Sequence, residues 1–244
     1  NDSTKGAVAY HEGDINKGFA ESDQKHESVY STAFVAHGLL EPYNAVVGNF
    51  KGIWHVITGT QANSFTGWGM PPMIAEKTNQ APEEVKLQVH QRLAGGGYGS
   101  RGDEPTRLAL IASIDIGKPV KLIYTREAMM KATEPRTATY QKLSAGTLSN
   151  GILNSLHIEL CAGSMMKRPE WGMPPNFFQK DLEGKDIKIG SWTIEGGDHW
   201  YSIPNRKYTL YENDKLNNAT PVTALRSISN GYMIFTVESF IDEI

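Results

Sequence analysis

The stretch LAGGGYGSR, residues 93–101, places three consecutive glycines before a tyrosine and a fourth glycine after it. Glycine runs cost folding entropy, and they persist where the backbone needs positive φ or where a ligand comes very close to it. Because a helix is expected to begin near Thr106, the N–H groups of the run could form a concave binding site for an anionic ligand. The alternative is a crowded turn between two layers, and the run taken alone favours that interpretation.

Two known phosphate-binding patterns fit this run poorly. A P-loop requires G-x-x-x-x-G-K-[ST], and GGGYGSRG has neither the lysine nor the spacing. The dinucleotide fingerprint G-x-G-x-x-G can be placed only on Gly97, Gly99 and Gly102, without the βαβ unit and the ribose-binding acid that should accompany it. A nucleotide-binding domain is therefore the weakest hypothesis for the chain.

Metal and hydrolase chemistry have little support in the sequence. His37 and Glu41 lie four residues apart, but Pro42 follows at once and no third ligand has a suitable spacing, so we interpret them as structural. Cys161 is the single cysteine, which excludes an internal disulfide and a cysteine-based zinc or iron–sulfur site. No G-x-S-x-G nucleophile elbow is present. We predict no metal-ligating residue.

Composition indicates a soluble globular protein. The 244 residues are 39% hydrophobic, which is enough for a real core. A net charge of −3 argues against nucleic-acid or anionic-membrane partners. No apolar run approaches the roughly 18 residues of a membrane span. Localisation stays open between the cytoplasm and a bacterial periplasm.

Helical and strand-like patterns must position the glycine run, and in residues 1–136 they alternate as in α/β layers. Expected there are a helix in 13–23, a strand in 26–36, two strands in 44–61 that turn at Lys51-Gly52, a helix and a strand in 71–93, and a helix and a strand in 103–127.

Residues 137–244 have a different, β-rich pattern. Strand-like segments occupy 137–146, 152–163, 185–196 and 206–213. A closing helix begins at Ser229/Asn230, with an apolar face formed by Met233, Ile234, Val237, Phe240, Ile241 and Ile244. The fold class predicted is α+β or mixed α/β, with layered sheets and packed helices. Its two parts, 1–136 and 137–244, could also form one intertwined domain.

Eight separated motifs, in a fixed order, resemble one protein family. They are GDINKGFAESD (13–23), FVAHGLLEPYNAVV (34–47), TGTQ (58–61), LAGGGYGSR (93–101), GKPVKLIYTRE (117–127), PRTATYQ (135–141), YSIPN (201–205) and ALRSISNGYMIFTVESFIDE (224–243). Together they resemble the molybdopterin-binding large subunit of the molybdenum hydroxylases, the xanthine dehydrogenase and aldehyde oxidase superfamily. The last two look closest to the isoquinoline 1-oxidoreductase β-subunit group.

The resemblance implies roles for individual residues. Gln61 matches the family glutamine whose amide hydrogen-bonds the oxo group on molybdenum, and an amide donates without carrying charge. The backbone of Gly96, Gly97, Tyr98 and Gly99 matches the stretch that touches the cofactor, with Tyr98 in place of the usual phenylalanine. Arg226 matches the arginine of the family's Arg-Gly-Phe-Gly-Gly stretch. Catalytic roles are thus expected for Gln61 and Arg226, and cofactor binding for the glycine run and Arg226.

The chain also departs from the family pattern. The family's general base is a glutamate in a Gly-x-Gly-Glu stretch far toward the C-terminus, and no such stretch is present. Ser100-Arg101-Gly102 stands where other branches have Gly-Lys-Glu, and SISNGY replaces most of the glycine-rich stretch after Arg226. The chain therefore resembles only the N-terminal half of the cofactor-binding region and is not expected to be a complete enzyme by itself.

The first hypothesis is thus a component of a molybdenum-dependent hydroxylase or dehydrogenase. The resemblance implies a molybdenum–molybdopterin cofactor, with the cytosine dinucleotide form as one candidate. It implies as partners the remaining C-terminal half of the large subunit, a 2Fe-2S iron–sulfur subunit, and an aldehyde or N-heterocycle oxidised with water as oxygen source. The alternative is a non-catalytic binding or assembly module descended from the same family.

Overall fold

The computed structural model describes residues 6–163, 193–197, 200–213, 215–216 and 220–244, which fall into two compact units. Unit 1 comprises residues 1–35 and 134–244, and unit 2 comprises residues 36–133. The sequence placed the whole of 1–136 in a first part. In the structure the first 35 residues instead belong with the C-terminal part, because their two strands pair with strands of unit 1.

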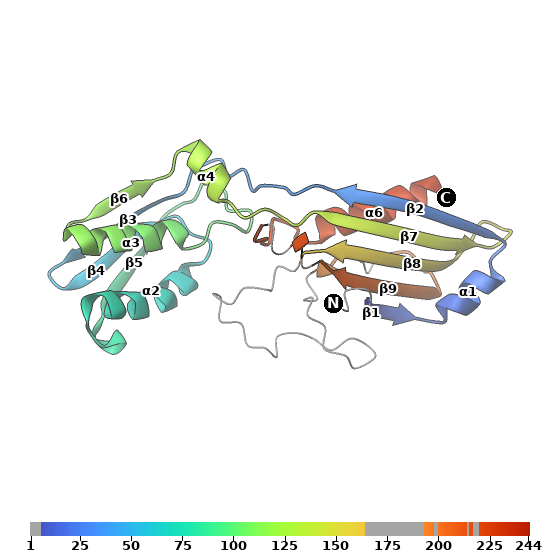
Figure 1. Ribbon diagram of the computed structural model, residues 1–244, viewed down its shortest axis with the longest axis horizontal. Helices are drawn as coiled ribbons and strands as arrows, with labels where there is room; N and C mark the ends of the chain where they lie inside the picture. Colours follow the sequence, from blue (N-terminus) through green and yellow to red (C-terminus); the bar gives the residue numbers. More distant parts are fainter. Residues whose placement is uncertain (1–5, 164–192, 198–199, 214, 217–219) are drawn as a thin grey trace. The chain divides into compact units, whose positions relative to one another are not determined.

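Unit 1 is built on a five-stranded sheet of order β1-β9-β8-β7-β2 (Figure 1). Its strands are β1 (Ala7–Glu12), β2 (Gln24–Thr32), β7 (Thr139–Thr147), β8 (Leu153–Ala162) and β9 (Asn205–Glu212). Neighbouring strands are antiparallel except β8 and β9. The short helix α1 (Ile15–Glu21) connects β1 to β2, and Asp14 caps it by accepting hydrogen bonds from two backbone N–H groups.

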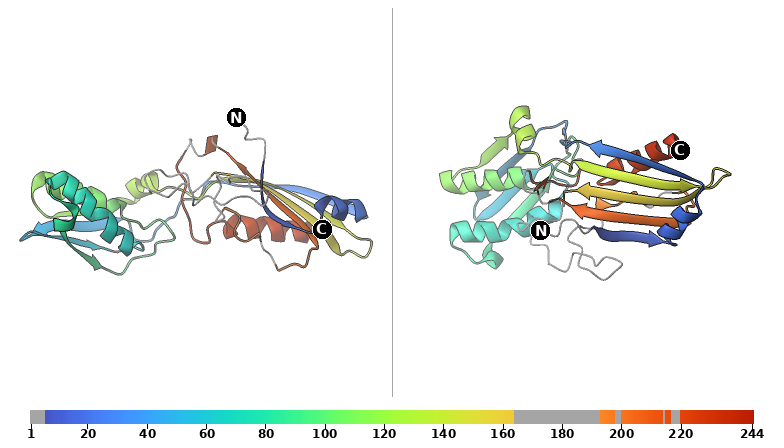
Figure 2. Two further views of the ribbon diagram at one scale, coloured as in Figure 1. Left: turned by 90° about the horizontal axis from the view of Figure 1, so that it is seen from below. Right: turned by 45° about the vertical axis from the view of Figure 1, so that its right-hand side comes forward.

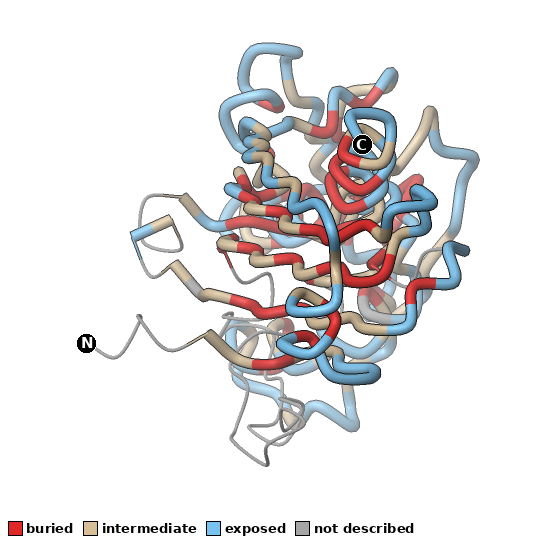
Figure 3. The backbone as a smooth tube through the Cα atoms, turned by 90° about the vertical axis from the view of Figure 1, so that its right-hand side faces the viewer, coloured by how far each residue is buried: buried red, intermediate tan, exposed pale blue. Residues whose placement is uncertain are grey.

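Helix α6 (Asn230–Glu243) lies against one face of this sheet (Figure 2). Buried and less buried positions alternate along the central strands, as expected when one face carries the core (Figure 3). Met233, Val237 and Phe240 of the predicted apolar face are buried, whereas Ile234 is 47% exposed. Tyr232 and Thr236 complete the buried side of the helix. The predicted strand at 185–196 lies largely outside the described residues.

Unit 2 is built on a four-stranded sheet of order β5-β4-β3-β6. Its elements are β3 (Asn44–Phe50), β4 (Ile53–Thr58), α2 (Asn63–Thr78), the 3₁₀ turn η1 (Pro82–Glu84), β5 (Lys86–Gln91), α3 (Glu104–Ile116), β6 (Val120–Ile123) and α4 (Arg126–Ala132). Helices α2 and α3 supply Met70, Ile74, Ala109 and Leu110 to a core that also holds Val47, Trp54 and Val56 of the sheet.

Local turn chemistry explains most boundaries in unit 2. Lys51 and Gly52 both have positive φ and close the β3–β4 hairpin, as predicted. Gly117 ends α3 in the left-handed conformation. Helix α2 differs from the expectation, because it begins at Asn63 and continues through Pro71 and Pro72, which the sequence suggested as its start. The fold class is mixed α and β with two sheets and packed helices, as predicted.

Within the described residues, no helix has both the length and the apolar character that are needed to cross a bilayer.

Candidate functional site

The glycine run and Gln61 meet because they follow two neighbouring parallel strands of unit 2. β4 and β5 pair in parallel, and Thr58 lies opposite Gln91 at their carboxyl ends. The chain after β4 leads through Gln61 into α2, and the chain after β5 leads through the glycine run into α3. Loops at the carboxyl ends of adjacent parallel strands leave from one edge of a sheet, which is a common place for ligand sites. Two predicted site segments are therefore brought together.

The side chain of Gln61 is oriented by the glycine loop. Its Oε1 accepts hydrogen bonds from the backbone N–H of Gly99 (3.2 Å) and of Arg101 (3.4 Å). Its own backbone N–H donates to the Arg101 carbonyl at 3.0 Å. Because two N–H donors converge on the oxygen, the amide NH₂ group occupies the other position. Gln61 is exposed, and its NH₂ group has no hydrogen-bond partner in the part of the chain that the structure describes.

The bare backbone of the glycine run makes room for the protein's own side chains. A β-carbon on Gly95 would lie 2.5 Å from the Glu41 β-carbon, and one on Gly96 would lie 2.9 Å from the Tyr98 ring. A β-carbon on Gly97 would lie 2.1 Å from Gln61 Oε1. Such contacts are too close for real side chains. Close packing against Glu41, Tyr98 and Gln61 therefore explains the glycines at 95, 96 and 97. From the sequence alone, this cause could not be told apart from the close approach of a ligand.

Three successive N–H groups of the loop remain available. Within the described residues, the backbone N–H groups of Gly96, Gly97 and Tyr98 donate no hydrogen bond, whereas those of Gly95 and Gly99 are engaged by Glu41 and Gln61. Gly96 has φ +84° and Tyr98 has φ +50°. Unpaired N–H groups in a loop with left-handed residues form a concavity that attracts anions.

Tyr98 adopts the left-handed conformation, which is uncommon for an aromatic residue and is one mark of a functional loop. Its half-buried ring packs against a small cluster of Leu39, Tyr43 and Met129. Tyr43 in turn donates a hydrogen bond from its hydroxyl to the Ser100 carbonyl at 3.0 Å. The ring therefore packs against side chains of its own unit.

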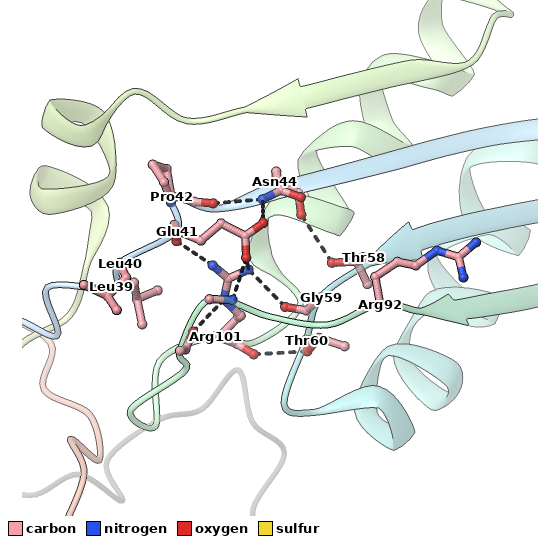
Figure 4. Close-up of polar contacts among 12 residues, drawn as sticks. Leu39, Leu40, Glu41, Pro42, Asn44, Thr58, Gly59, Thr60, Arg92 and Arg101 are labelled. Carbon is pink, nitrogen blue, oxygen red and sulfur yellow. Dashed lines mark hydrogen bonds and ion pairs between the residues drawn. The ribbon is translucent and has the colours of Figure 1, made fainter.

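Arg101 is a buried arginine that sequence reasoning missed. Its side chain is 2% exposed and donates to the carbonyls of Gly96 (2.9 Å), Gly59 (3.1 Å) and Glu41 (Figure 4). Its Nη1 also lies 3.2 Å from Glu41 Oε2. The Thr60 hydroxyl donates to the Arg101 carbonyl at 3.0 Å. One residue thus connects the glycine loop with the segments before α2 and before β3.

The Glu41 carboxylate completes this cluster. Oε2 accepts the Gly95 N–H at 2.7 Å, and Oε1 accepts the Asn44 amide at 2.8 Å. The hydrogen bond from Gly95, then that from Asn44, and finally the Arg101 charge lower the pKa of this carboxyl below its ordinary value. These contacts support the structural interpretation of Glu41. His37 is 4% exposed, and the described residues contain no group of three or more His, Cys, Asp or Glu side chains placed to hold a metal.

Arg226 belongs to unit 1 and lies in the turn before α6. Its side chain is exposed, and its carbonyl accepts a hydrogen bond from Arg136 Nη2 at 2.6 Å. The next residues, Ser227 and Ile228, have φ values of +68° and +39°. Left-handed backbone is strained for a β-branched residue, so this turn keeps a glycine-type conformation without glycine.

The chain is similar in sequence to one protein family and to several known enzymes. The sequence model of the molybdopterin cofactor-binding domain matches residues 1–173. The chain is 29% identical over 246 aligned residues to a membrane-bound aldehyde dehydrogenase (pyrroloquinoline-quinone) of Gluconacetobacter polyoxogenes, an alignment that covers 100% of this chain and 30% of that protein. It is 26% identical over 160 residues to the aldehyde oxidoreductase molybdenum-binding subunit PaoC of Escherichia coli O157:H7, covering 63% of this chain and 20% of that one.

A solved structure has the same fold. Quinoline 2-oxidoreductase from Pseudomonas putida 86 superposes with a TM-score of 0.66 at 17% identity, over 100% of this chain and 29% of that one. The chain therefore spans about a third or less of the length of the proteins it matches.

Proposed function

Because the chain belongs to the molybdopterin cofactor-binding domain family, we propose that it forms part of the cofactor site of a molybdenum hydroxylase-type oxidoreductase. The substrate class is an aldehyde or an N-heterocycle, and water is the oxygen source. The relatives named as aldehyde dehydrogenase and aldehyde oxidoreductase support the aldehyde assignment. The likeness to the isoquinoline 1-oxidoreductase group, carried by YSIPN and the closing helix, supports the N-heterocycle.

The observation that carries the proposal is the set of open donors in unit 2. Three loop N–H groups, at Gly96, Gly97 and Tyr98, donate no hydrogen bond within the described residues, and the Gln61 amide, whose oxygen is held by the same loop, has an NH₂ group that is likewise unpaired there. Uncharged N–H donors suit an anionic, phosphate-bearing cofactor with oxo groups. The residues present thus fit a molybdenum–molybdopterin group. Gly99 contributes differently, since its N–H is used to orient Gln61.

The residues of this chain would bind and orient. When bound, the cofactor supplies the two-electron redox chemistry and the oxygen-transfer step. The loop N–H groups would hold its anionic part, and the Gln61 NH₂ group would donate to an oxo group. For Arg226, whose side chain is exposed in unit 1, we propose that its positive charge serves cofactor binding. We extend the proposal to the cytosine dinucleotide form as one candidate.

Other parts of the assembly would complete the catalytic machinery. No Gly-x-Gly-Glu stretch occurs in these 244 residues, so the proposed general base is supplied by the remaining part of the large subunit. Electrons would leave through a 2Fe-2S partner subunit. Both partners are proposed from the family.

An isotope experiment tests this function. The full-length protein, with its iron–sulfur partner, is incubated with benzaldehyde or isoquinoline in H₂¹⁸O and an artificial electron acceptor. We expect ¹⁸O in the acid or the hydroxylated heterocycle. Turnover with unlabelled product would contradict water as the oxygen source. No turnover of either substrate class by protein that contains molybdenum would favour the non-catalytic binding or assembly module.

A further inference from the structure

Arg101 joins three separate segments of unit 2 through the N–H donors of its side chain. Its guanidinium is buried, and its donors reach carbonyl groups on three separate chain segments, at Glu41, Gly59 and Gly96. Arginine has five N–H donors in a rigid planar arrangement, whereas lysine has a single ammonium group. A buried guanidinium is tolerated only with such partners and with a counter-ion, here Glu41 at 3.2 Å.

The backbone of Arg101 acts on Gln61 directly. Its N–H donates to Gln61 Oε1, and its carbonyl accepts the Gln61 backbone N–H. The orientation of the Gln61 side chain therefore depends on where the backbone of Arg101 is held. If the guanidinium lost its partners, the N–H groups of Gly99 and Arg101 would no longer converge on the amide oxygen.

Glu41 secures the opposite end of the glycine run. It accepts the Gly95 N–H through Oε2, and its own N–H donates to the Gly95 carbonyl at 3.2 Å. Gly95 and Arg101 thus bracket the three residues whose N–H groups are open. The bracket is a charge-assisted network, which is stronger than neutral hydrogen bonds of the same number.

We infer that Arg101, held by Glu41, is a positioning residue that fixes the Gln61 amide with its NH₂ group outward and keeps the N–H groups of Gly96, Gly97 and Tyr98 open. The orienting effect belongs to the protein alone. Its consequence for a cofactor rests on the proposed function. An amide that turned over would present its oxygen to an oxo group, and two acceptors repel each other.

Nuclear magnetic resonance of the full 244-residue chain tests the positioning without any cofactor. In Arg101→Gln we expect hydrogen exchange at the amides of Gly99 and residue 101 to rise at least about tenfold, and the Gln61 side-chain NH₂ signals to move to the shifts of a mobile glutamine. Arg101→Lys keeps the charge with fewer donors, so it should restore part of the protection. Arg107→Gln, an exposed arginine on α3, is the matched control and should leave these signals unchanged.

Glu41→Gln provides the same readout if Arg101→Gln does not fold, because it weakens the network without emptying a buried position. Unchanged Gln61 signals and unchanged exchange in folded Arg101→Gln, or in Glu41→Gln, would overturn the inference. A uniform loss of protection across unit 2, with no separate change at Gln61, would also overturn it, since that pattern describes a structural arginine only.

A second measurement separates this inference from the proposed function. The same variants in the full-length protein are assayed for molybdenum content and turnover. A mobile Gln61 together with turnover reduced at least about tenfold supports both. A mobile Gln61 with wild-type turnover supports the positioning role and contradicts the proposed function of Gln61.

Discussion

Gln61 Oε1 lies 2.1 Å from the position that a β-carbon on Gly97 would occupy. The two residues are on different loops of unit 2. The Gln61 amide occupies the space that a side chain at position 97 would need, so only glycine leaves room for it there. Two residues further along the loop, the Gly99 N–H donates to the same amide oxygen.

Gly97→Ala should therefore displace the Gln61 side chain. The nearest atoms are at the tip of a flexible side chain, so the free energy of unfolding should fall by less than about 1 kcal/mol. Turnover of the full-length protein should fall much more, because the Gln61 amide is no longer held in place. Gly102→Ala is the control, because nothing lies within 4 Å of its β-carbon position. Equal and small effects of both variants would contradict the account.

Gln61→Glu should separate two roles of the side chain: its orientation by the loop N–H groups, and the hydrogen bond that its NH₂ group would donate to the cofactor. The carboxylate keeps an oxygen for the N–H groups of Gly99 and Arg101 but replaces the NH₂ donor with a second acceptor. We expect turnover of the assembled protein to fall by roughly 10²- to 10³-fold, as when a preorganised donor is removed. Molybdenum content should stay near that of the wild type. A parallel loss of content and turnover would show that Gln61 is structural.

Ser227→Gly should stabilise unit 1. Ser227 is exposed and has φ +68°, and left-handed backbone costs a residue with a β-carbon about 1 kcal/mol or more relative to glycine. We expect the free energy of unfolding in urea to rise by about 1 kcal/mol. Ser239→Gly is the matched control, since it lies inside α6 and should lower stability. Destabilisation by Ser227→Gly would mean that the serine side chain, and not the backbone conformation, is required.

Glu41 should make stability depend on pH in the acid range. Its folded pKa is lowered, chiefly by the Gly95 N–H, so its contribution is fully present above the unfolded pKa of about 4.3. That contribution is lost as the pH falls through the lower folded pKa. Urea unfolding from about pH 6 to about pH 3 should show a smaller loss of stability in Glu41→Gln.

The difference between wild type and Glu41→Gln isolates this group, because Glu12 and Glu243 of unit 1 also have lowered pKa values and are present in both proteins. An identical pH dependence in the two proteins would mean that Glu41 is not engaged as described.

Features with local causes could be predicted from the sequence. Asp14 caps α1, Lys51-Gly52 closes a hairpin and Gly117 ends α3, because in each case the residue type sets the backbone of its immediate neighbours. The start of helix α2 could not be predicted in this way, because Pro71-Pro72 suggests a helix start, whereas the helix begins at Asn63 and packs Met70 and Ile74 into the core.

Features with long-range causes could not be predicted. Arg101 binds the Glu41 carbonyl across 60 residues of sequence, and no local pattern joins them. The association of residues 1–35 with unit 1 depends on pairing of β1 with β9 and β2 with β7. The family resemblance directed attention to Gln61 and the glycine loop. It left open which groups of that loop serve the protein and which remain for a ligand.

The central claim is that this chain supplies binding residues to a molybdenum cofactor. Elemental mass spectrometry of the full-length protein, purified with its co-purifying subunits, tests it most directly. We expect close to one molybdenum per large subunit, because the assembly would hold one cofactor site. No molybdenum in protein whose remaining half is present and folded, after expression in cells that make the cofactor, would contradict the account and leave the loop as a structural turn.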